Sequence, residues 1–272
     1  MTSRDGAIDF PALAPMRWRR HAVTLGRIAL AALLVAAWKI GADAAGPLYI
    51  ADPVKVLARI VADTQSGVLI RHTYVTLRLS AIGFALGCGL GIALPLLLRR
   101  LPRLTAAVEP YIMASVGIPK YALVPLFILW FGIDDAPKLW LVGLLVFYVV
   151  FIAVFAGIRS VDRGLIDMAR VAGAGEMAIA REVIWNSLLP FFFAALKIAL
   201  PRAVSAAIIG EFLVGNEGLG YLIESLRQNF DTTGVFAGIM VATALVLVIN
   251  AALGMVARRV NAWRPTDRHM EI

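Results

Sequence analysis

The chain has 272 residues, of which 60% are hydrophobic and 16% are charged, and its formal net charge is +8. A soluble globular domain is typically about 45–50% apolar and about 25% charged. This composition, with a mean hydropathy of +0.81, excludes such a domain and predicts a membrane protein with several spans. We attribute the basic excess to loops at one membrane face rather than to nucleic-acid binding. The single cysteine, Cys88, excludes an intrachain disulfide and a cysteine-based zinc site.

Six apolar segments are long enough to cross a hydrocarbon core about 30 Å thick, which predicts an all-α fold with six transmembrane helices. The segments are 24–45, 74–98, 107–131, 137–158, 188–213 and 235–257. The third segment contains Pro110, Pro119 and Pro125. Proline removes a backbone donor, so we expect the helix in this segment to be broken or kinked.

The distribution of lysine and arginine predicts how the spans are oriented. The segments on the side of both termini hold fifteen basic residues, and those on the other side hold five. Because basic residues are enriched in cytoplasmic loops, we expect cytoplasmic tails at 1–23 and 259–272 and a cytoplasmic loop at 159–187. A single transmembrane domain fills residues 24–258. On the opposite side, the apolar spacing in 53–71 predicts a short amphipathic helix on the membrane surface.

Motifs that carry chemistry are missing from the sequence. There is no Gly-Lys-Ser or Gly-Lys-Thr, so the chain cannot bind ATP in the manner of a P-loop. The histidines His21, His72 and His269 share no metal-ligand spacing and no catalytic arrangement with Ser, Asp or Cys. We therefore expect no catalytic residue, no metal and no cofactor in this chain.

A glycine repeat marks the second predicted span. Gly83, Gly87 and Gly91 recur at every fourth residue of an apolar stretch. Small residues at this spacing allow two helix backbones to approach closely, so we expect this face to pack against another helix. The pattern leaves open whether the neighbouring helix belongs to the same chain or to a second copy.

The loop at 159–187 mixes charged residues with small or apolar ones. The charged residues include Asp167, Arg170, Glu176 and Arg181, and the others include Met168, Ala169, Val171, Ala172 and Ala178. Gly173 can end one short helix and start another at an angle. Such an elbow with an apolar edge suits docking into a groove of another protein. The alternative is an ordinary loop at the membrane interface.

This loop resembles the coupling loop of ABC-importer permeases, the cytoplasmic element that grips a separate ATPase. The family pattern is Glu-Ala-Ala, three residues, Gly, nine residues and an aliphatic residue, followed by Leu-Pro. The corresponding stretch of this chain includes Asp167, Met168, Ala169, Arg170, Gly173, Ala174 and Val183. It departs from the pattern at Asp167 (Glu), at Met168 (Ala) and at Trp185-Asn186 (Leu-Pro).

Further segments are similar to the permeases for nitrate, taurine, aliphatic sulfonates, bicarbonate and pyrimidine precursors. These segments are 119–126, 129–133 with Lys138, then Leu69, His72, Thr76-Leu77 and Gly83-Phe84, and later Pro190, Leu196-Lys197, Glu211 and 218–223. The resemblance extends from about residue 50 to residue 257.

The resemblance implies a type I ABC importer fold and a place in the bacterial inner membrane. It implies that two copies of the permease pair around a central pathway and that each loop docks on one of two ATPase subunits. A periplasmic solute-binding protein would deliver the substrate, and ATP binding would drive alternating access. The chain itself would be a permease subunit without an ATPase site.

Four charged residues lie within or at the rim of the predicted spans: Lys120, Lys197, Arg202 and Glu211. A charge at the middle of a membrane costs at least about 2.5–3.5 kcal/mol, so it usually faces protein or a water-filled cavity. All four are candidates for the pathway. Arg202 lies nearest the middle of its span, where it either attracts an anion or forms a structural ion pair. For Glu211 we favour a structural partner, and for Lys197 a side chain that extends toward the cytoplasmic face.

The alternative function is a secondary transporter driven by an ion gradient. It would explain the spans and the intramembrane charges, but it leaves the coupling-like loop unexplained and predicts inverted repeats, which are not apparent. A membrane-embedded enzyme is disfavoured by the absent catalytic set. A basic pathway favours a small anionic substrate such as a sulfonate or nitrate, and neutral pyrimidine-like or vitamin-like substrates stay open.

Overall fold

The computed structural model describes residues 17–260, and every regular element in that range is helical. The α-helices are α1 (Arg17–Ala45), α2 (Pro53–Gln65), α3 (Val68–Leu98), α4 (Pro102–Ser115), α5 (Val124–Phe131), α6 (Asp135–Arg159), α7 (Arg163–Val171), α8 (Glu176–Ala178), α9 (Trp185–Val214), α10 (Leu219–Gln228) and α11 (Thr232–Val260). A 3-10 helix, η1 (Lys120–Leu123), precedes α5, and a π-helical segment, η2 (Ile179–Ile184), precedes α9. The expected tails, 1–23 and 259–272, lie outside the described residues except where α1 and α11 extend into them.

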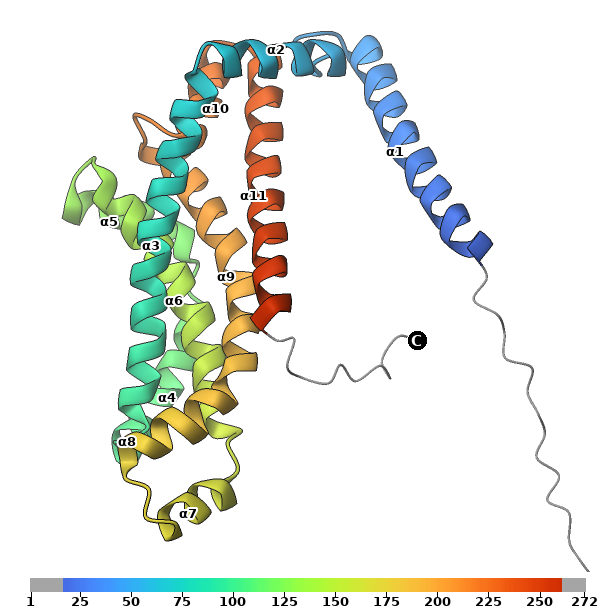
Figure 1. Ribbon diagram of the computed structural model, residues 1–272. Coiled ribbons are helices and arrows are strands. Elements are labelled where there is room, and N and C mark those ends of the chain that lie inside the picture. Colours follow the sequence, from blue (N-terminus) through green and yellow to red (C-terminus); the bar gives the residue numbers. More distant parts are fainter. Residues whose placement is uncertain (1–16, 261–272) are drawn as a thin grey trace, which may run out of the picture.

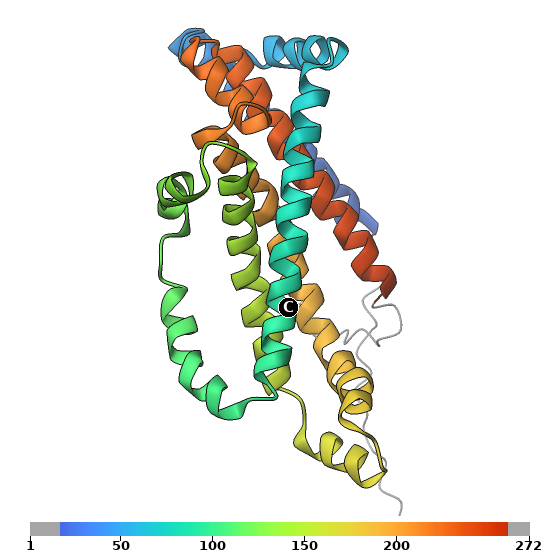
Figure 2. The same ribbon diagram turned by 90° about the vertical axis from the view of Figure 1, so that its left-hand side faces the viewer.

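Five helices are long and apolar enough to cross a membrane: α1, α3, α6, the joined helix Glu176–Val214, and α11. A sixth span exists only if α4 and the pair η1–α5 are counted together, because they are bent by 92° at the break between them. The all-α prediction is confirmed, and so is the broken third segment. Figure 2 shows α4 and α5, in green, beside the bundle with a non-helical link between them.

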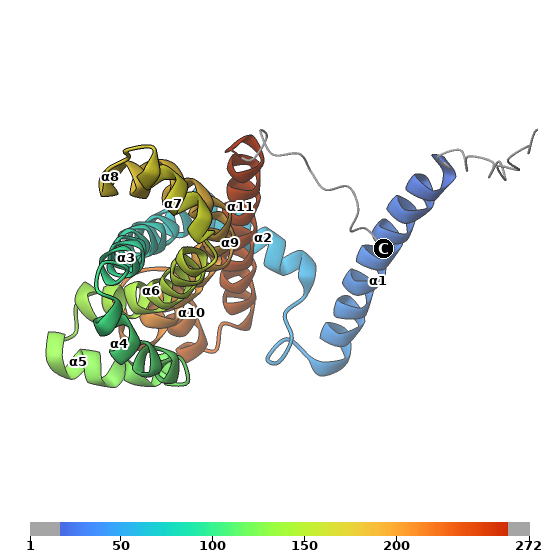
Figure 3. The ribbon, with the colours of Figure 1, turned by 90° about the horizontal axis from the view of Figure 1, so that it is seen from below.

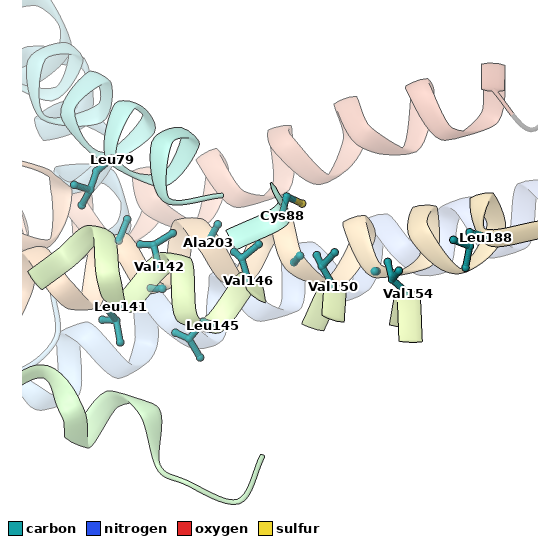
Figure 4. Close-up of a cluster of buried hydrophobic side chains, with 14 of the residues drawn as sticks. Leu79, Cys88, Leu141, Val142, Leu145, Val146, Val150, Val154, Leu188 and Ala203 are labelled. Atoms are coloured by element: carbon teal, nitrogen blue, oxygen red, sulfur yellow. The ribbon is translucent and has the colours of Figure 1, made fainter. Parts of the chain in front are cut away.

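The core of the bundle is formed by α3, α6 and α9, whose buried aliphatic side chains meet along their lengths (Figure 4). Val142, Val146 and Val150 of α6 lie at its centre and are fully buried. Their spacing of four residues places them on one face of the helix, as expected for a helix packed along its whole length. This core fixes the relative positions of α3, α6 and α9 and of the loops that connect them.

The glycine repeat lies where α3 meets α6 of the same chain. A Cβ atom at Gly83 would lie 2.6 Å from Val142 Cβ, and one at Gly87 would lie 2.5 Å from the Gly143 carbonyl oxygen. Gly91 is similarly crowded. A larger side chain would push the two helices apart, so close packing requires glycine at these positions.

The helix α2 is shorter than the predicted amphipathic helix at 53–71. Asp52 caps its first turn, and the helix ends at Gln65. Gly67 follows in the left-handed region, with φ +82°, and α3 begins at once at a new angle. The second span therefore starts before the predicted residue 74. Glycine reaches this conformation without a steric penalty, and one such residue separates the two helices.

The helix α1 stands apart from the bundle (Figures 1 and 3). It is attached near its C-terminal end: Trp38 Nε1 donates a hydrogen bond to the Ala51 carbonyl at 3.0 Å, Lys39 pairs with Asp52 at 2.7 Å, and the Trp38 ring stacks on Phe236 of α11. Its apolar side chains are almost all exposed within the chain. The surface of α1 therefore needs lipid or another protein to cover it.

The two ends of the bundle carry different short helices. We call the end that carries α7 and α8 the loop end, and the opposite end, with α2 and α10, the α2 end (Figure 1). At the α2 end, Arg59 donates to Asp63 at 2.7 Å and to Asp231 at 2.8 Å, which ties α2 to the start of α11.

Candidate functional site

The loop at the loop end begins with α7 and turns at a glycine. Asp162 caps α7 by accepting a hydrogen bond from the Gly164 N–H at 2.8 Å. After the helix, Gly173 adopts φ +85°, and the Ala174 N–H donates to the Ala169 carbonyl at 2.9 Å. A Cβ atom at Gly173 would meet nothing within 4 Å. Glycine is therefore required at this position for its backbone conformation and not for space.

The second arm of the loop is not a separate short helix. Residues Glu176–Val214 form one continuous helix through α8, η2 and α9. The helix that contains the fifth span therefore begins well before the predicted residue 188. The prediction of two short helices across Gly173 is wrong for this arm. The charged residues Arg181 and Glu182 lower the local hydropathy, and an apolar window therefore misses a helix that extends beyond the membrane.

Large apolar side chains are exposed on both arms of the elbow. We call them the loop patch, which consists of Leu165, Met168 and Val171 on α7 and of Met177 at the start of the second arm. Val171 is 90% exposed and Met177 is 71% exposed. The sequence analysis named Met168 and Val171 but did not predict the patch as a unit. The sequence signal for the patch is the spacing of Leu165, Met168 and Val171, which lie three residues apart among charged residues. Apolar residues at this spacing share one face of a helix.

The other small residues of the predicted site face the opposite way. Ala169, Ala174 and Val183 pack against the core formed by α3, α6 and α9. The site residues thus fall into two groups, with Met168 on the exposed side and these three on the buried side. The elbow is fixed to the bundle by its inner face and leaves its outer face free.

Charged residues connect the two arms across the turn. Arg170 Nη2 donates to Glu176 Oε1 at 2.9 Å, Arg170 lies 3.6 Å from Asp167, and Glu176 lies 3.7 Å from Arg99 at the end of α3. An open cleft of about 960 Å³ lies beside them, lined by Arg99, Arg100, Arg163, Ile166, Asp167, Arg170, Glu176 and Met177. These pairs are exposed, so they orient the arms more than they stabilise the fold.

The four intramembrane charges lie on η1 and α9. Lys120 is in η1, where its ammonium donates to the Val116 carbonyl at 2.9 Å, and Arg202 is exposed in the middle of α9. Lys197 is exposed on α9, five residues before Arg202 and about 140° around the helix from it. Glu211 lies further along α9, near the α2 end.

Glu211 is buried, with 1% of its surface exposed, in a hydrogen-bonded cluster at the α2 end. Its Oε2 accepts hydrogen bonds from the Thr76 hydroxyl at 2.8 Å and from the Gly220 N–H at 3.0 Å. The Thr76 hydroxyl in turn accepts from the Leu219 N–H at 2.9 Å. We call the five residues Thr76, Glu211, Gly218, Leu219 and Gly220 the clasp, because they hold the start of α10 against α3 and α9.

Gly218 completes the clasp. Its backbone has φ +104°, its N–H donates to His72 Nδ1 at 3.0 Å, and a Cβ atom there would lie 2.1 Å from Glu211 Cδ. Buried Lys138 on α6 attracts the Glu211 carboxylate and pairs with Asp135 at 2.8 Å. Sequence reasoning missed this cluster, although a glutamate in an apolar helix followed by Gly-Leu-Gly was a visible signal.

The described helices define a multi-pass membrane protein with one exposed elbow and no arrangement for covalent chemistry among the residues that the structure describes. The chain belongs to the family of binding-protein-dependent transport system inner membrane components, whose profile matches residues 83–262. It is therefore the permease component of an ABC importer, a multi-pass inner-membrane protein, and not the ATPase. A system of this kind includes an ATPase and a solute-binding protein.

Similar proteins share most of the length of the chain. It is 34% identical to the formylaminopyrimidine transport permease protein ThiX of Halalkalibacterium halodurans over 85% of this chain and 93% of that one. It is 30% identical to the putative aliphatic sulfonates transport permease protein SsuC of Bacillus subtilis over 86% of each. It is 27% identical to the taurine transport system permease protein TauC of Escherichia coli, covering 91% and 94%.

A solved structure shares the fold. The MetNI methionine ABC transporter has been solved in inward-facing conformations, and a chain of it matches this protein with a TM-score of 0.62 and 21% sequence identity. The match covers 73% of this chain and 98% of that chain. At this identity the likeness concerns the fold alone, and it agrees with the predicted type I importer architecture.

Proposed function

We propose that this permease imports a small anionic solute and that the loop at 159–187 is the element through which an ATPase subunit drives it. The observation that carries the proposal is the loop patch, which places Met168 and Val171 on a protruding helix with no described residue to cover them. Helices with such a face dock into apolar grooves of other proteins. Asp167 and Arg170 flank the patch and add charge to its rim.

The attachment of the elbow explains how docking could move the spans. Its second arm continues without a break into α9, and its inner residues Ala169, Ala174 and Val183 pack on the core. A force applied to α7 therefore reaches α6 and α9 through packed side chains and a continuous helix. Packed cores shift between discrete arrangements, which is the behaviour that alternating access requires.

The assembly follows from the family and from the exposed surface. Two copies of this chain pair, each loop docks on one of two ATPase subunits, and a binding protein delivers the substrate at the α2 end. The loop end and both termini lie in the cytoplasm, as the distribution of basic residues indicates. The membrane domain extends over about residues 24–258. ATP binding draws the two loops together, and hydrolysis releases them.

A small anion fits both the relatives and the chemistry. Two of the relatives are described as permeases for taurine and aliphatic sulfonates, and three of the four intramembrane charges, Lys120, Lys197 and Arg202, are positive. Because one relative is described as a formylaminopyrimidine permease, a neutral heterocycle is the competing substrate class. The competing mechanism is transport driven by an ion gradient, which needs no docked ATPase.

Site-specific crosslinking of the loop patch tests the proposal. We would replace Val171 by cysteine, purify the importer from its native membrane and apply a thiol-to-amine crosslinker. The natural Cys88 is buried and adds little background. We expect a crosslink to a P-loop ATPase, identified by mass spectrometry. The matched control is Ile133→Cys, which is 80% exposed at a loop near the other end of the bundle. An ATPase that crosslinks equally to both, or to neither, contradicts the docking role of the loop.

A further inference from the structure

A basic cleft lies where the end of α3 meets the elbow, at the loop end of the bundle. Figures 1 and 3 show α8 beside this end of α3. The cleft has a volume of about 960 Å³, which is within the range of about 300–1,000 Å³ that small-molecule sites occupy. Its wall holds four arginines and two acids, an excess of two positive charges: Arg99, Arg100, Arg163, Arg170, Asp167 and Glu176. Docking of an ATPase on the loop patch leaves this excess charge unexplained.

One carboxylate holds two of the four arginines in place. Glu176 Oε1 accepts a hydrogen bond from Arg170 Nη2 at 2.9 Å, and Glu176 Oε2 lies 3.7 Å from Arg99 Nη2. Arg170 also lies 3.6 Å from Asp167. Both acids of the cleft are therefore engaged by Arg99 and Arg170, and the pairs join the end of α3 to both arms of the elbow.

The other two arginines carry the excess charge. Arg100 follows α3, Arg163 begins α7, and both line the same cleft. Both are exposed, and neither forms an ion pair with any side chain that the structure describes. Like charges in the wall of one cavity repel each other, and an anion between them replaces the repulsion by two attractions. The cleft therefore favours a ligand that carries negative charge.

The apolar part of α3 places the cleft at the membrane surface. Residues 79–98 contain no charged residue. At about 1.5 Å per residue this stretch extends over about 30 Å, which is the thickness of the hydrocarbon core. Arg99 and Arg100 follow directly, at the depth of the phospholipid phosphates. Guanidinium groups bind phosphate oxygens in pairs, and basic pockets beside membrane spans bind lipid headgroups.

We infer that the cleft binds a phosphate group through Arg100 and Arg163, with an anionic phospholipid headgroup or inorganic phosphate as its source. Arg99 and Arg170, held by Glu176, form the wall behind the phosphate. The bound group joins the end of α3 to the start of α7 and so restrains the elbow. This site goes beyond the proposed import function, because it exists whether or not an ATPase docks on the loop patch.

Thermal unfolding of the importer, purified from its native membrane and depleted of lipid, tests the site. The probes are dihexanoyl phosphatidylglycerol, dihexanoylglycerol, which has the same chains without the phosphate, and inorganic phosphate, compared with chloride at equal ionic strength. We expect the phospholipid to raise the unfolding midpoint and dihexanoylglycerol to leave it unchanged. A further rise with inorganic phosphate shows that the free anion is sufficient, and no rise assigns the site to the lipid headgroup.

Three arginine variants locate the effect. Arg100→Gln and Arg163→Gln each remove charge-assisted hydrogen bonds, so the phospholipid concentration that gives half of the rise should increase about tenfold or more. Arg103→Gln is the matched control. Arg103 is also exposed and forms no ion pair with a described side chain, and it lies three residues after Arg100, but it does not line the cleft. This variant should keep the concentration of the natural chain.

Three results would overturn the site: an unchanged concentration in Arg163→Gln, an equal increase in Arg103→Gln, or an equal rise with dihexanoylglycerol. Copurification of the ATPase is scored in the same samples. If no phosphate compound raises the midpoint and the ATPase is lost from Arg100→Gln and Arg163→Gln alone, the phosphate site is wrong and the cleft instead receives an acidic segment of the ATPase. A rise that depends on Arg100 and Arg163 supports the site even if no ATPase copurifies.

Discussion

The clasp and the elbow each combine a glycine in the left-handed region with a glutamate, yet they differ in burial. In the clasp, Gly218 lies against Glu211, which is almost wholly buried and holds two hydrogen bonds at one oxygen. In the elbow, Gly173 has open space around it, and Glu176 pairs with Arg170 at the surface. The same residue types therefore serve the stability of the chain at one end and contact with a partner at the other.

Replacing Gly218 and Gly173 by alanine should give the largest difference in stability loss between the clasp and the elbow. Gly218→Ala combines a left-handed backbone with a clash against Glu211, so we expect it to lower the free energy of unfolding by about 3 kcal/mol or more. Gly173→Ala meets only the backbone penalty, about 1–2 kcal/mol. Thermal unfolding in detergent measures both. Equal losses would show that the clasp is not more tightly packed than the elbow.

The Thr76 hydroxyl is the next largest contributor to the difference. Thr76→Val leaves the Leu219 N–H and the Glu211 carboxylate each without one partner in a buried place, and we expect a loss of about 2 kcal/mol. Thr64→Val is the control, because its hydroxyl bonds only to the Ile60 carbonyl on exposed α2. It should change the free energy of unfolding by less than about 0.5 kcal/mol. A similar loss in both variants would contradict a special role for the clasp.

Proline at the elbow should affect coupling far more than folding. Gly173→Pro requires φ near −65° at a position that has φ +85°, so the elbow cannot keep its angle. We expect loss of ATPase stimulation by the binding protein while the chain stays folded in the membrane. Gly175→Pro is the matched control, because Gly175 already has φ −71°. Unchanged coupling in Gly173→Pro would contradict the role of the elbow.

The surface pair Arg170–Glu176 should contribute little to stability. Both side chains are more than half exposed, so we expect Glu176→Gln to lower the free energy of unfolding by less than about 1 kcal/mol. The difference should disappear in 1 M salt, where the screening length is about 3 Å. A larger loss that is insensitive to salt would mean that the elbow is as firmly fixed as the clasp.

The smallest effect concerns pH at the α2 end. Hydrogen bonds from Arg227 lower the pKa of the partly buried Glu224 carboxylate to about 2. Because the folded pKa lies below the usual value near 4.3, this pair stabilises the fold above that value. The contribution is lost as the pH falls toward 2. The difference between the natural chain and Glu224→Gln should shrink over that range, and a difference that grows on acidification would contradict the assignment.

Hydropathy alone was enough to predict the spans, because about 20 apolar residues in a row have few alternatives. The four-residue spacing of Gly83 and Gly87 predicted a helix-packing face, but it does not encode which helix packs on that face. Hydropathy missed the clasp, because Thr76 and Glu211 are 135 residues apart and meet only in the folded chain. It also started the helix of the fifth span too late, because the part of a helix that lies outside the membrane carries charges like any soluble helix.

The π-helical segment Ile179–Ile184 sets the rotational phase of the elbow relative to α9. A π-helical turn holds one more residue than an α-helical turn, and such segments often occur at functional sites. Deleting one residue there would restore α-helical spacing, turn the preceding residues by about 100° around the axis and draw them in by about 1.5 Å. The loop patch would then point in another direction while the composition of the chain barely changed. A single extra residue thus decides which way the permease presents its docking surface.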